Sequence, residues 1–486
     1  MKVLLLNSSF LYRTPWLIVT EPLGILYLAA YLRKYSAHKV SVLDCVSNKR
    51  VKKIGPRQYW YGLDTKEMLE AIELLKPDII GITCMFSRKK DDFLRCASLI
   101  KKKFPQIILV GGGIYPSLFP GDLAVNKQFD YFIAGEGEQS FLNLVNTLSD
   151  NSQAKENIEG LAFLRDGKVI VNPKKTYIEN LDTIPHPARD LIDYEGYAAR
   201  KIALGGLGLK RSASLLTSRS CPNRCNFCSM FMVHGPKWRG RTAQDVISEI
   251  AELKERYKIK DLFIMDDNFT FNKQRVMEIC EGILRAGLKI RWNTPNGISI
   301  ATLDRELLSV MKASGCRSIS IAIESGDEEL RNKVIGKRLS DAAIFKAAQE
   351  ASRLGIFINA YYIIGMPGET EEKFQRTLRQ VRELPFNAVD FSFANPLPGT
   401  KLYQDCIANN WKMLEHDPKN EDTLYRPYIV TADFTENDLA LREKRFYRTF
   451  YLAKFFTIIK DALLLRNKLL YPRFIMRILS SKIFRG

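Results

Sequence analysis

The sequence lacks several features, and each absence excludes a class of protein. No run of apolar residues approaches the roughly 18 residues that a membrane-spanning helix needs. The nine cysteines are an odd number and lie scattered apart from one group, so we expect a reducing compartment and no disulfide framework. The start, MKVLLLNSSF, has only four consecutive apolar residues after its lysine, which predicts a buried strand and no signal peptide. We therefore expect a cytoplasmic protein.

Acidic residues are scarce relative to basic ones, and the imbalance is concentrated near one end of the chain. The formal net charge is +19. From Arg445 to Arg485 there are ten Lys or Arg residues and a single acidic residue, Asp461. A nucleic-acid groove is more often built from the folded body, with aromatic side chains between the basic ones. The sequence therefore predicts no nucleic-acid partner.

The chain of 486 residues is too long for one ordinary core and predicts several domains. Strand and helix patterns divide it into residues 1–149, a connector at 150–210, a second repeating region at 211–400, and a mostly helical region at 401–486 with the basic tail. The connector contains a hairpin pattern with an Asp-Gly turn and then a stretch rich in proline and acid.

Residues 1–149 alternate short apolar strands with amphipathic helices, which predicts an α/β fold with a doubly wound parallel sheet. Small residues follow the predicted strands, among them Thr83, Gly112, Gly113, Gly135 and Gly137. In such sheets ligands bind at the carboxyl ends of the strands, where glycine lets the backbone approach them. Any one of these glycines could simply form a turn. Their recurrence at successive strand ends favours a ligand-binding edge.

Six strand patterns separated by helices fill residues 211–400 and predict a partial (β/α)6 barrel, with functional residues at the carboxyl ends of its strands. Polar residues fall at those ends, including Asp266 to Asn268, Glu324 and Ser325. A single carboxylate at such a position is more often a helix cap than a functional group. Several at equivalent positions favour one shared site.

The only group of cysteines lies in SRSCPNRCNFCSMF, where Cys221, Cys225 and Cys228 fall within eight residues. Zinc prefers four ligands, commonly as two pairs, and the chain has no second pair. A redox-active dithiol would need only two of the three cysteines. Three thiolates around a cubic iron–sulfur cluster leave one iron open for another ligand, and thiolates suit iron. The spacing therefore favours a 4Fe-4S cluster over three unrelated thiols.

This loop, with Phe227 before its last cysteine, resembles the signature of the radical S-adenosylmethionine (SAM) superfamily. The resemblance implies that the open iron of the 4Fe-4S cluster binds the amino and carboxylate groups of SAM. The reduced cluster then cleaves SAM to a 5′-deoxyadenosyl radical that abstracts a hydrogen atom, while the protein binds, orients and shields the reactants.

Further segments resemble one subgroup of that superfamily, in which a cobalamin-binding domain precedes the radical SAM barrel. In the first region these segments are EPLGILYLAAYLRK, KPDIIGIT, LVGGGIYPS and FIAGEGEQSF, and in the barrel they are FIMDDNFTFN, TPNGI, AIESG and IIGMPGETEE. The resemblance places Asp266 to Asn268 near the methionine moiety of SAM, and Glu324 and the Gly365 to Gly368 turn near its ribose and adenine.

Carried over to this chain, the resemblance names two sets of cofactor contacts besides the three cysteine ligands. The SAM contacts are Phe227, Asp266, Asp267, Asn268, Glu324, Ser325, Gly365 and Gly368. The cobalamin contacts are Thr83, Gly112, Gly113, Gly135, Glu136 and Gly137.

One departure from corrinoid methyltransferases concerns the ligand below the cobalt. Those proteins carry an Asp-x-His-x-x-Gly loop after the first strand, and the corresponding NSSFLYRTPWLIV contains no histidine. His38, the only histidine of residues 1–149, precedes the second strand. We therefore expect bound cobalamin to lack a lower histidine ligand.

The resemblance implies a cobalamin-dependent radical SAM enzyme that methylates an unactivated carbon, with one SAM supplying the radical and a second the methyl group. One alternative is an oxidative cyclase or another radical reaction without methyl transfer. Another is a protein that holds cobalamin and has lost its chemistry, although the intact cysteine motif argues against it. The expected partners are a small-molecule or lipid substrate and an external electron donor of the flavodoxin or ferredoxin type.

The tail allows two interpretations. Apolar residues from Phe446 to Leu470 recur at helical spacing with basic residues between them, and Pro472 is predicted to separate a second, shorter helix. The helices could close the open side of the barrel. Alternatively, a basic amphipathic segment favours a peripheral contact with anionic lipid on the inner face of the membrane.

Overall fold

The computed structural model describes residues 1–15, 19–47, 50–121, 127–150, 154–199, 211–414 and 426–463, with side chains through Phe455. It divides into two compact units. The N-terminal unit comprises Met1–Arg200 and Ser229–Arg241, and the barrel unit comprises Lys201–Cys228 and Thr242–Gly486. The predicted division into four segments stays a prediction. None of the helices in the described ranges has the length and apolarity needed to cross a membrane.

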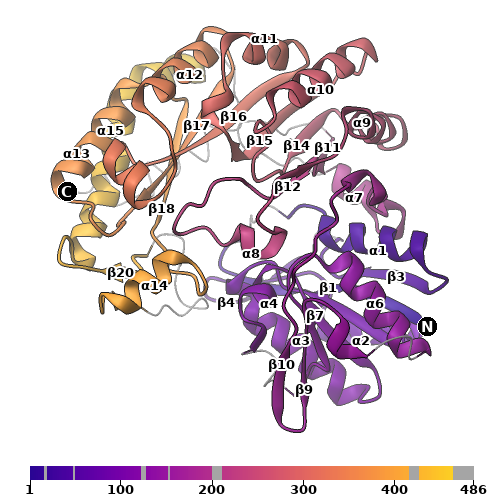
Figure 1. The fold of residues 1–486 in the computed structure, drawn as a ribbon. Helices are drawn as coiled ribbons and strands as arrows, with labels where there is room; N and C mark the ends of the chain where they lie inside the picture. The colour runs from indigo at the N-terminus through magenta and orange to yellow at the C-terminus, as the bar shows by residue number, and fades with distance from the viewer. Residues whose placement is uncertain are drawn as a thin grey trace. The chain divides into compact units, whose positions relative to one another are not determined.

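The N-terminal unit is built on a seven-stranded sheet in the order β10-β9-β8-β7-β6-β1-β3 (Figure 1). Five strands run parallel, and β9 and β10 add an antiparallel hairpin at one edge. The strands are β1 (Lys2–Asn7), β3 (Lys39–Asp44), β6 (Ile79–Thr83), β7 (Ile108–Gly112), β8 (Tyr131–Ile133), β9 (Leu161–Arg165) and β10 (Lys168–Val171). The helices are α1 (Leu23–Tyr35), α2 (Thr65–Leu75), α3 (Lys90–Lys103), α4 (Ile114–Leu118), α6 (Gly137–Asp150), α7 (Tyr194–Ala198) and α8 (Met230–His234).

Successive side chains of a strand point to opposite faces of this sheet, and their contacts show which helices cover each face. Leu4 and Ile80 belong to a core that also contains Ile72 of α2 and Ile100 of α3. On the opposite face α1 packs against α6, and a side chain at Gly81 would come within 2.9 Å of Leu5 and 3.3 Å of Phe141 of α6. The predicted doubly wound parallel sheet is confirmed.

The order of the five parallel strands determines where this sheet can bind a ligand. Numbered by their position in the sequence, these five strands lie across the sheet in the order 2-1-3-4-5, and the connections reverse direction between β1 and β6. In open parallel sheets ligands bind at the carboxyl ends of the strands beside this reversal. The residues that follow β1 and β6 are therefore the ones closest to the expected ligand.

A small antiparallel sheet in the order β2-β5-β4 was not predicted from the sequence. It consists of β2 (Phe10–Tyr12), β4 (Val51–Gly55) and β5 (Gln58–Tyr61). The rings of Phe10 and Tyr61 stack with their centroids 5.2 Å apart. Its first strand lies within the loop after β1, so that loop is partly ordered by strand pairing.

The barrel unit contains six parallel strands in the order β11-β14-β15-β16-β17-β18, which confirms the predicted partial barrel. The strands are β11 (Ser212–Leu215), β14 (Asp261–Ile264), β15 (Arg291–Ile298), β16 (Cys316–Glu324), β17 (Phe357–Ile364) and β18 (Ala388–Phe393). Helices cover the outer side of the curved sheet: α9 (Ala243–Tyr257), α10 (Lys273–Arg285), α11 (Arg305–Ala313), α12 (Asp341–Arg353) and α13 (Glu371–Glu383) (Figure 1). Shorter elements are β12 (Ser218–Arg219), β13 (Arg239–Gly240, in the N-terminal unit), α14 (Lys401–Ala408), β19 (Lys412–Met413) and β20 (Ile429–Val430).

The outer helices begin where the sequence provides an N-cap. In each case a Ser, Thr, Asp or Asn side chain accepts a hydrogen bond from a backbone N–H in the first turn, which satisfies a donor that the helix itself cannot. These caps are Thr242, Asn272, Asp304, Ser340 and Thr370. Each is the residue just before its helix, so the caps fix the helix starts along the barrel.

The long helix α15 (Glu436–Leu463) packs against α13 and β17. Phe446 is fully buried, and its ring contacts the rings of Tyr362 and Phe391 at centroid distances of 5.5 and 5.4 Å. The described part of the tail therefore packs on the barrel, and the two interpretations of the whole tail stay predictions. Residues beyond 463, including the expected break at Pro472, lie outside the described part of the chain.

Candidate cluster, SAM and cobalamin sites

The cysteine loop follows β12, a few residues after the first barrel strand β11, and is turned by its own backbone. Ser220, the residue before Cys221, has a positive φ of 69°, and the backbone N–H of Cys228 donates to the carbonyl of Cys225 at 3.0 Å. All three thiols are free. Cys225 is buried, and Cys221 and Cys228 are partly exposed. A short loop of this kind can present three thiolates to one face of a cluster.

Apolar packing holds the end of the cysteine loop against the barrel. Cys225 belongs to a buried group with Leu330, Ile363 and Met366, and Phe227 and Cys228 pack against this group. Phe227, predicted to contact SAM, is therefore partly buried beside the cysteines.

Asp266 anchors the residues that lead into the cysteine loop. Its carboxylate accepts hydrogen bonds from the backbone N–H and the hydroxyl of Thr217, both at 2.6 Å, and from the hydroxyl of Ser218 at 2.5 Å. The side chain is 1 % exposed, and burial raises the pKa of this carboxyl, although Arg275 and these hydrogen bonds oppose the shift. The predicted SAM contact at Asp266 therefore also has a positioning role that its place after β14 did not reveal.

The two residues after Asp266 differ in their surroundings. The side-chain amide of Asn268 lies 3.5 Å from the Sγ of Cys221, and its oxygen accepts from the backbone N–H of Ser299 at 3.2 Å. Asn268 is buried, whereas Asp267 is half-buried. The strand-end segment is thus brought directly against the first cysteine.

Glu324 and Lys337 form an ion pair near the cysteines. The Oε1 of Glu324 lies 2.8 Å from the Nζ of Lys337, and the two side chains are 8 and 15 % exposed. Glu324 has a φ of 70°, a left-handed conformation that costs energy in a residue with a side chain. Ser325 follows in a tight turn, where its hydroxyl accepts from the backbone N–H of Asp327.

The ionisable groups around the cysteines shift one another's pKa values. Burial raises the pKa of the Cys225 thiol to about 12, against the opposing effect of Lys337. Burial alone would lower the pKa of Lys337, but Glu324, Cys225 and Cys221 raise it above its usual value. Lys337 is therefore a permanent positive charge beside ligands that must give up protons to bind iron.

In the described ranges, no three histidine, cysteine or carboxylate side chains converge closely enough to hold a single metal ion.

The Gly365 to Gly368 turn after β17 is held by carboxylates. The backbone N–H of Gly365 donates to Glu369 at 2.9 Å, and that of Gly368 donates to Asp433 at 3.0 Å. Glu369 is fully buried and pairs with Arg442 of α15 at 3.0 Å. Both glycines have φ near 80°, which favours glycine at these positions.

In the N-terminal unit, the predicted cobalamin residues lie at the carboxyl edge of the sheet but differ in the space around them. A side chain added at Gly112 or Gly137 would meet nothing within 4 Å. At Gly113 it would come within 2.8 Å of the carbonyl of Cys84 and 3.0 Å of the hydroxyl of Thr83. Gly112 and Gly137 therefore leave room for a ligand, and Gly113 is needed for close backbone packing.

Two residues that the sequence analysis did not single out suit a corrin at this edge. Met85 and Phe86 follow β6 beside the reversal of the sheet, and they are 42 and 49 % exposed. The guanidinium of Arg88 lies 4.9 Å from the ring centre of Phe86. Exposed apolar side chains beside open glycine backbone fit a flat, largely apolar ligand with amide side chains. The signal that could have found them is the unusual run CMF directly after a buried strand.

Glu136 is engaged by residues that follow the cysteine loop in the sequence. Its carboxylate receives two hydrogen bonds from Arg239, at 2.7 and 3.0 Å, and lies 3.5 Å from the Nδ1 of His234. Both side chains of the Glu136–Arg239 pair are only 3 % exposed. A side chain at Gly135 would come within 3.1 Å of Lys174. Glu136 therefore holds the segment Ser229–Arg241 within the N-terminal unit.

Comparison with protein-family models matches both parts of the chain. Residues 18–145 match the B12 binding domain, and residues 215–381 match the radical SAM superfamily. The first range includes the glycine-rich strand ends, and the second includes the three cysteines and the Gly365 to Gly368 turn.

Two curated relatives align over most of the chain. The cytidylyl-2-hydroxyethylphosphonate methyltransferase of Streptomyces wedmorensis is 31% identical over 458 residues, which cover 87% of this chain and 84% of the relative. The anaerobic magnesium-protoporphyrin IX monomethyl ester cyclase of Rubrivivax gelatinosus is 26% identical over 444 residues, covering 90% and 74%.

A solved structure shares the fold. The radical SAM methyltransferase TsrM from Kitasatospora setae, solved with cobalamin and a 4Fe-4S cluster bound, matches with a TM-score of 0.69 at 20% identity, over 84% of this chain and 78% of that one. With both family models matched in one chain, the protein belongs to the cobalamin-binding subgroup of the radical SAM superfamily, whose cofactors are a 4Fe-4S cluster, SAM and cobalamin.

Proposed function

We propose that this enzyme methylates an unactivated carbon atom of a small-molecule or lipid substrate. The observation that carries the proposal is the combination, in one chain, of an intact three-cysteine loop on a six-stranded barrel with a B12 binding domain. The 31% identity to a methyltransferase over most of both chains supports methyl transfer. When bound, the cluster and SAM supply the radical, and cobalamin carries the methyl group.

The residues of this chain would bind and orient these cofactors. Cys221, Cys225 and Cys228 would hold the cluster, and Asp266 would fix the start of their loop through Thr217 and Ser218. Lys337 would offset the negative charge of the thiolates. The open backbone at Gly112 and Gly137, with Met85 and Phe86, would accept the corrin.

The test is the fate of a labelled methyl group. Reconstituted, chemically reduced enzyme is incubated with SAM carrying a trideuterated methyl group and with a small-molecule extract of its own cells. The proposal expects an extract component to gain the intact trideuterated methyl group only when the protein carries both cobalamin and the cluster. A product formed without the label would contradict methyl transfer.

The alternative reaction is oxidative ring formation. The 26% identity to an anaerobic cyclase over 90% of this chain supports this alternative. A cyclase would release 5′-deoxyadenosine in step with an unlabelled product. The same incubation therefore distinguishes the two reactions.

A second part of the proposal concerns partners. We propose an external electron donor of the flavodoxin or ferredoxin type, together with a peripheral contact between the basic tail and anionic lipid. Leu441, Leu452 and Phe455 of α15 are more than half exposed. Because Phe446 and Phe450 are buried, the appropriate comparison is the full chain against a chain ending at Leu463. Flotation of the full chain alone with anionic vesicles would support the lipid contact, and equal behaviour of the two would refute it.

A further inference from the structure

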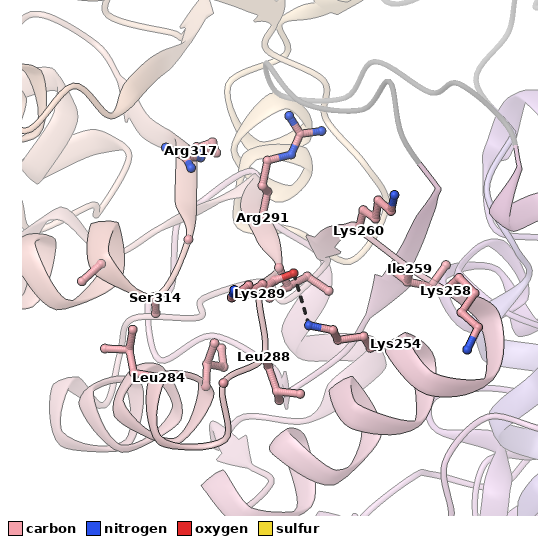
Figure 2. Close-up of a pocket in the computed structure, with 15 residues that line it drawn as sticks. Lys254, Lys258, Ile259, Lys260, Leu284, Leu288, Lys289, Arg291, Ser314 and Arg317 are labelled. Atoms are coloured by element: carbon pink, nitrogen blue, oxygen red, sulfur yellow. Dashed lines mark hydrogen bonds between the residues drawn. The ribbon is translucent and has the colours of Figure 1, made fainter.

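A cavity of about 640 Å³ lies at the opposite end of the barrel strands from the cysteine loop. Its lining residues directly precede β14, β15 and β16: Lys258 to Lys260, Gly287 to Ile290, and Ala313 to Gly315. Figure 2 shows basic side chains from several elements around it. In barrels of this type the chemistry occurs at the carboxyl ends of the strands, so this cavity is separate from the proposed active site.

The cavity is strongly basic. Six of its lining residues are Lys or Arg, and none is Asp or Glu: Lys254, Lys258, Lys260, Lys289, Arg291 and Arg317. Arg291 is neutralised by two hydrogen bonds to the buried carboxylate of Asp261, at 2.6 and 2.7 Å. The Nζ of Lys254 donates to the carbonyl of Lys289 at 3.5 Å (Figure 2).

The other five basic side chains have no ion pair within the described parts of the chain. Basic residues often serve only to balance the negative ends of helices, and α9, α10 and α11 all end here. Each helix end carries about half a negative charge, so three ends account for roughly one and a half charges. The five positive charges exceed the negative charge of the three helix ends by more than three. This excess favours the binding of an anion.

The floor of the cavity is apolar. Ile259, Ile283 and Ile290 are buried there, and Leu284 is 47 % exposed at its edge. At neutral pH a phosphate monoester carries close to two negative charges and the phosphodiester of a phospholipid about one, and lysine binds either as a point charge. An apolar body attached to the phosphate would cover the exposed leucine. We propose that this cavity binds a phosphate ester that carries an apolar chain.

A phosphate ester attached to an apolar chain occurs both in soluble metabolites and in phospholipids. The test separates these two sources. The full-length protein, with its cofactors reconstituted, is titrated with inorganic phosphate, hexyl phosphate and hexanol, using calorimetry and thermal shift. In parallel it is floated with phosphatidylglycerol vesicles and with phosphatidylcholine vesicles. The double variant Lys260→Glu/Lys289→Glu reverses two exposed charges in the cavity.

A matched control reverses two exposed lysines of the same unit that lie outside the cavity, Lys346→Glu/Lys412→Glu. Saturable binding of hexyl phosphate is expected, at least about tenfold tighter than inorganic phosphate because of the buried methylenes. The cavity variant should lose about tenfold or more in affinity, and the control should not.

Each outcome either supports the proposal or overturns it. Binding of hexyl phosphate in solution identifies a soluble ester, and binding only of phosphatidylglycerol vesicles, lost in the cavity variant, identifies a lipid headgroup. Absence of both, or an equal loss in the control variant, overturns the proposal. None of these readouts depends on methyl transfer, so the proposed binding site and the proposed reaction are tested independently.

Discussion

At the scale of single residues, Asp266 links the end of β14 to the start of the cysteine loop. Its place at a strand end could be predicted from the sequence, because a carboxylate follows the apolar run LFIM. Its partners could not be predicted, because Thr217 and Ser218 are nearly fifty positions away and are common residue types. The same holds for Lys337, whose pairing with Glu324 depends on the turn between them.

Replacing Asp266 by Asn should loosen this link. An amide cannot accept all three hydrogen bonds, and one buried donor would face the amide N–H groups. We expect a loss of about 2–3 kcal/mol in the free energy of unfolding and less iron retained after anaerobic reconstitution. Urea unfolding and iron analysis measure the two effects. Asp267→Asn at the adjacent, half-buried position is the control, and equal losses in both variants would contradict the anchoring role.

Glu369 predicts a specific pH dependence of stability. Burial raises the pKa of this carboxyl from 4.5 to about 7, although Gly365 and Arg442 oppose the shift. Between these values the folded chain holds a proton that the unfolded chain has released, so stability should fall as pH rises through this window. The slope contributed is at most about 1.4 kcal/mol per pH unit.

Glu369→Gln should remove this fall in urea unfolding measured from pH 5 to pH 7.5. Glu371→Gln is the control, because hydrogen bonding to Arg445 lowers the pKa of Glu371 and its contribution has the opposite sign. An unchanged profile in Glu369→Gln would show that this carboxyl does not titrate in the window.

At the scale of elements, the main strands of both sheets followed from apolar runs and strand–helix alternation. The sheet of β2, β5 and β4 could not be predicted in this way, because its strands are short and β4 is almost entirely exposed. The membership of α8 and β13 in the N-terminal unit was also hidden, since it depends on contacts between α4 and α8 and on the Glu136–Arg239 pair.

The Glu136–Arg239 pair should be essential for anchoring α8. Removing one member leaves a buried charge without its partner, which costs about 3–5 kcal/mol. We expect Glu136→Gln and Arg239→Gln each to lower the urea midpoint, and the double variant to lose less than the sum of the two. Additive losses would mean that the two side chains do not interact.

Helix α15 offers a comparison between a buried and an exposed aromatic residue. Phe446→Ala should cost about 3–5 kcal/mol, because the ring is fully buried against β17 and β18. Phe455→Ala, at a side chain 54 % exposed, should change the free energy of unfolding by less than about 0.5 kcal/mol. Similar effects at both positions would contradict the packing of α15 on the barrel.

At the scale of the whole molecule, the chain joins a B12 binding domain to a radical SAM domain, and each is built on a parallel sheet. The cofactors were predictable because the cysteine spacing and several segments resemble a known subgroup. The substrate was not, because the residues after β18 contain no recognisable arrangement of histidines and carboxylates, and residues 415–425 lie outside the described ranges. The basic cavity was also hidden, since its side chains come from three separate helix-to-strand segments of the barrel unit.

The most direct test of the central claim is the release of 5′-deoxyadenosine from SAM by the anaerobically reconstituted, chemically reduced full-length protein. The account predicts about four irons per chain and steady release of 5′-deoxyadenosine. It also predicts neither property in the Cys221→Ala/Cys225→Ala/Cys228→Ala variant, whose N-terminal unit should still unfold cooperatively. Protein that holds zinc without iron, or that carries its full iron content and leaves SAM uncleaved, would contradict the account.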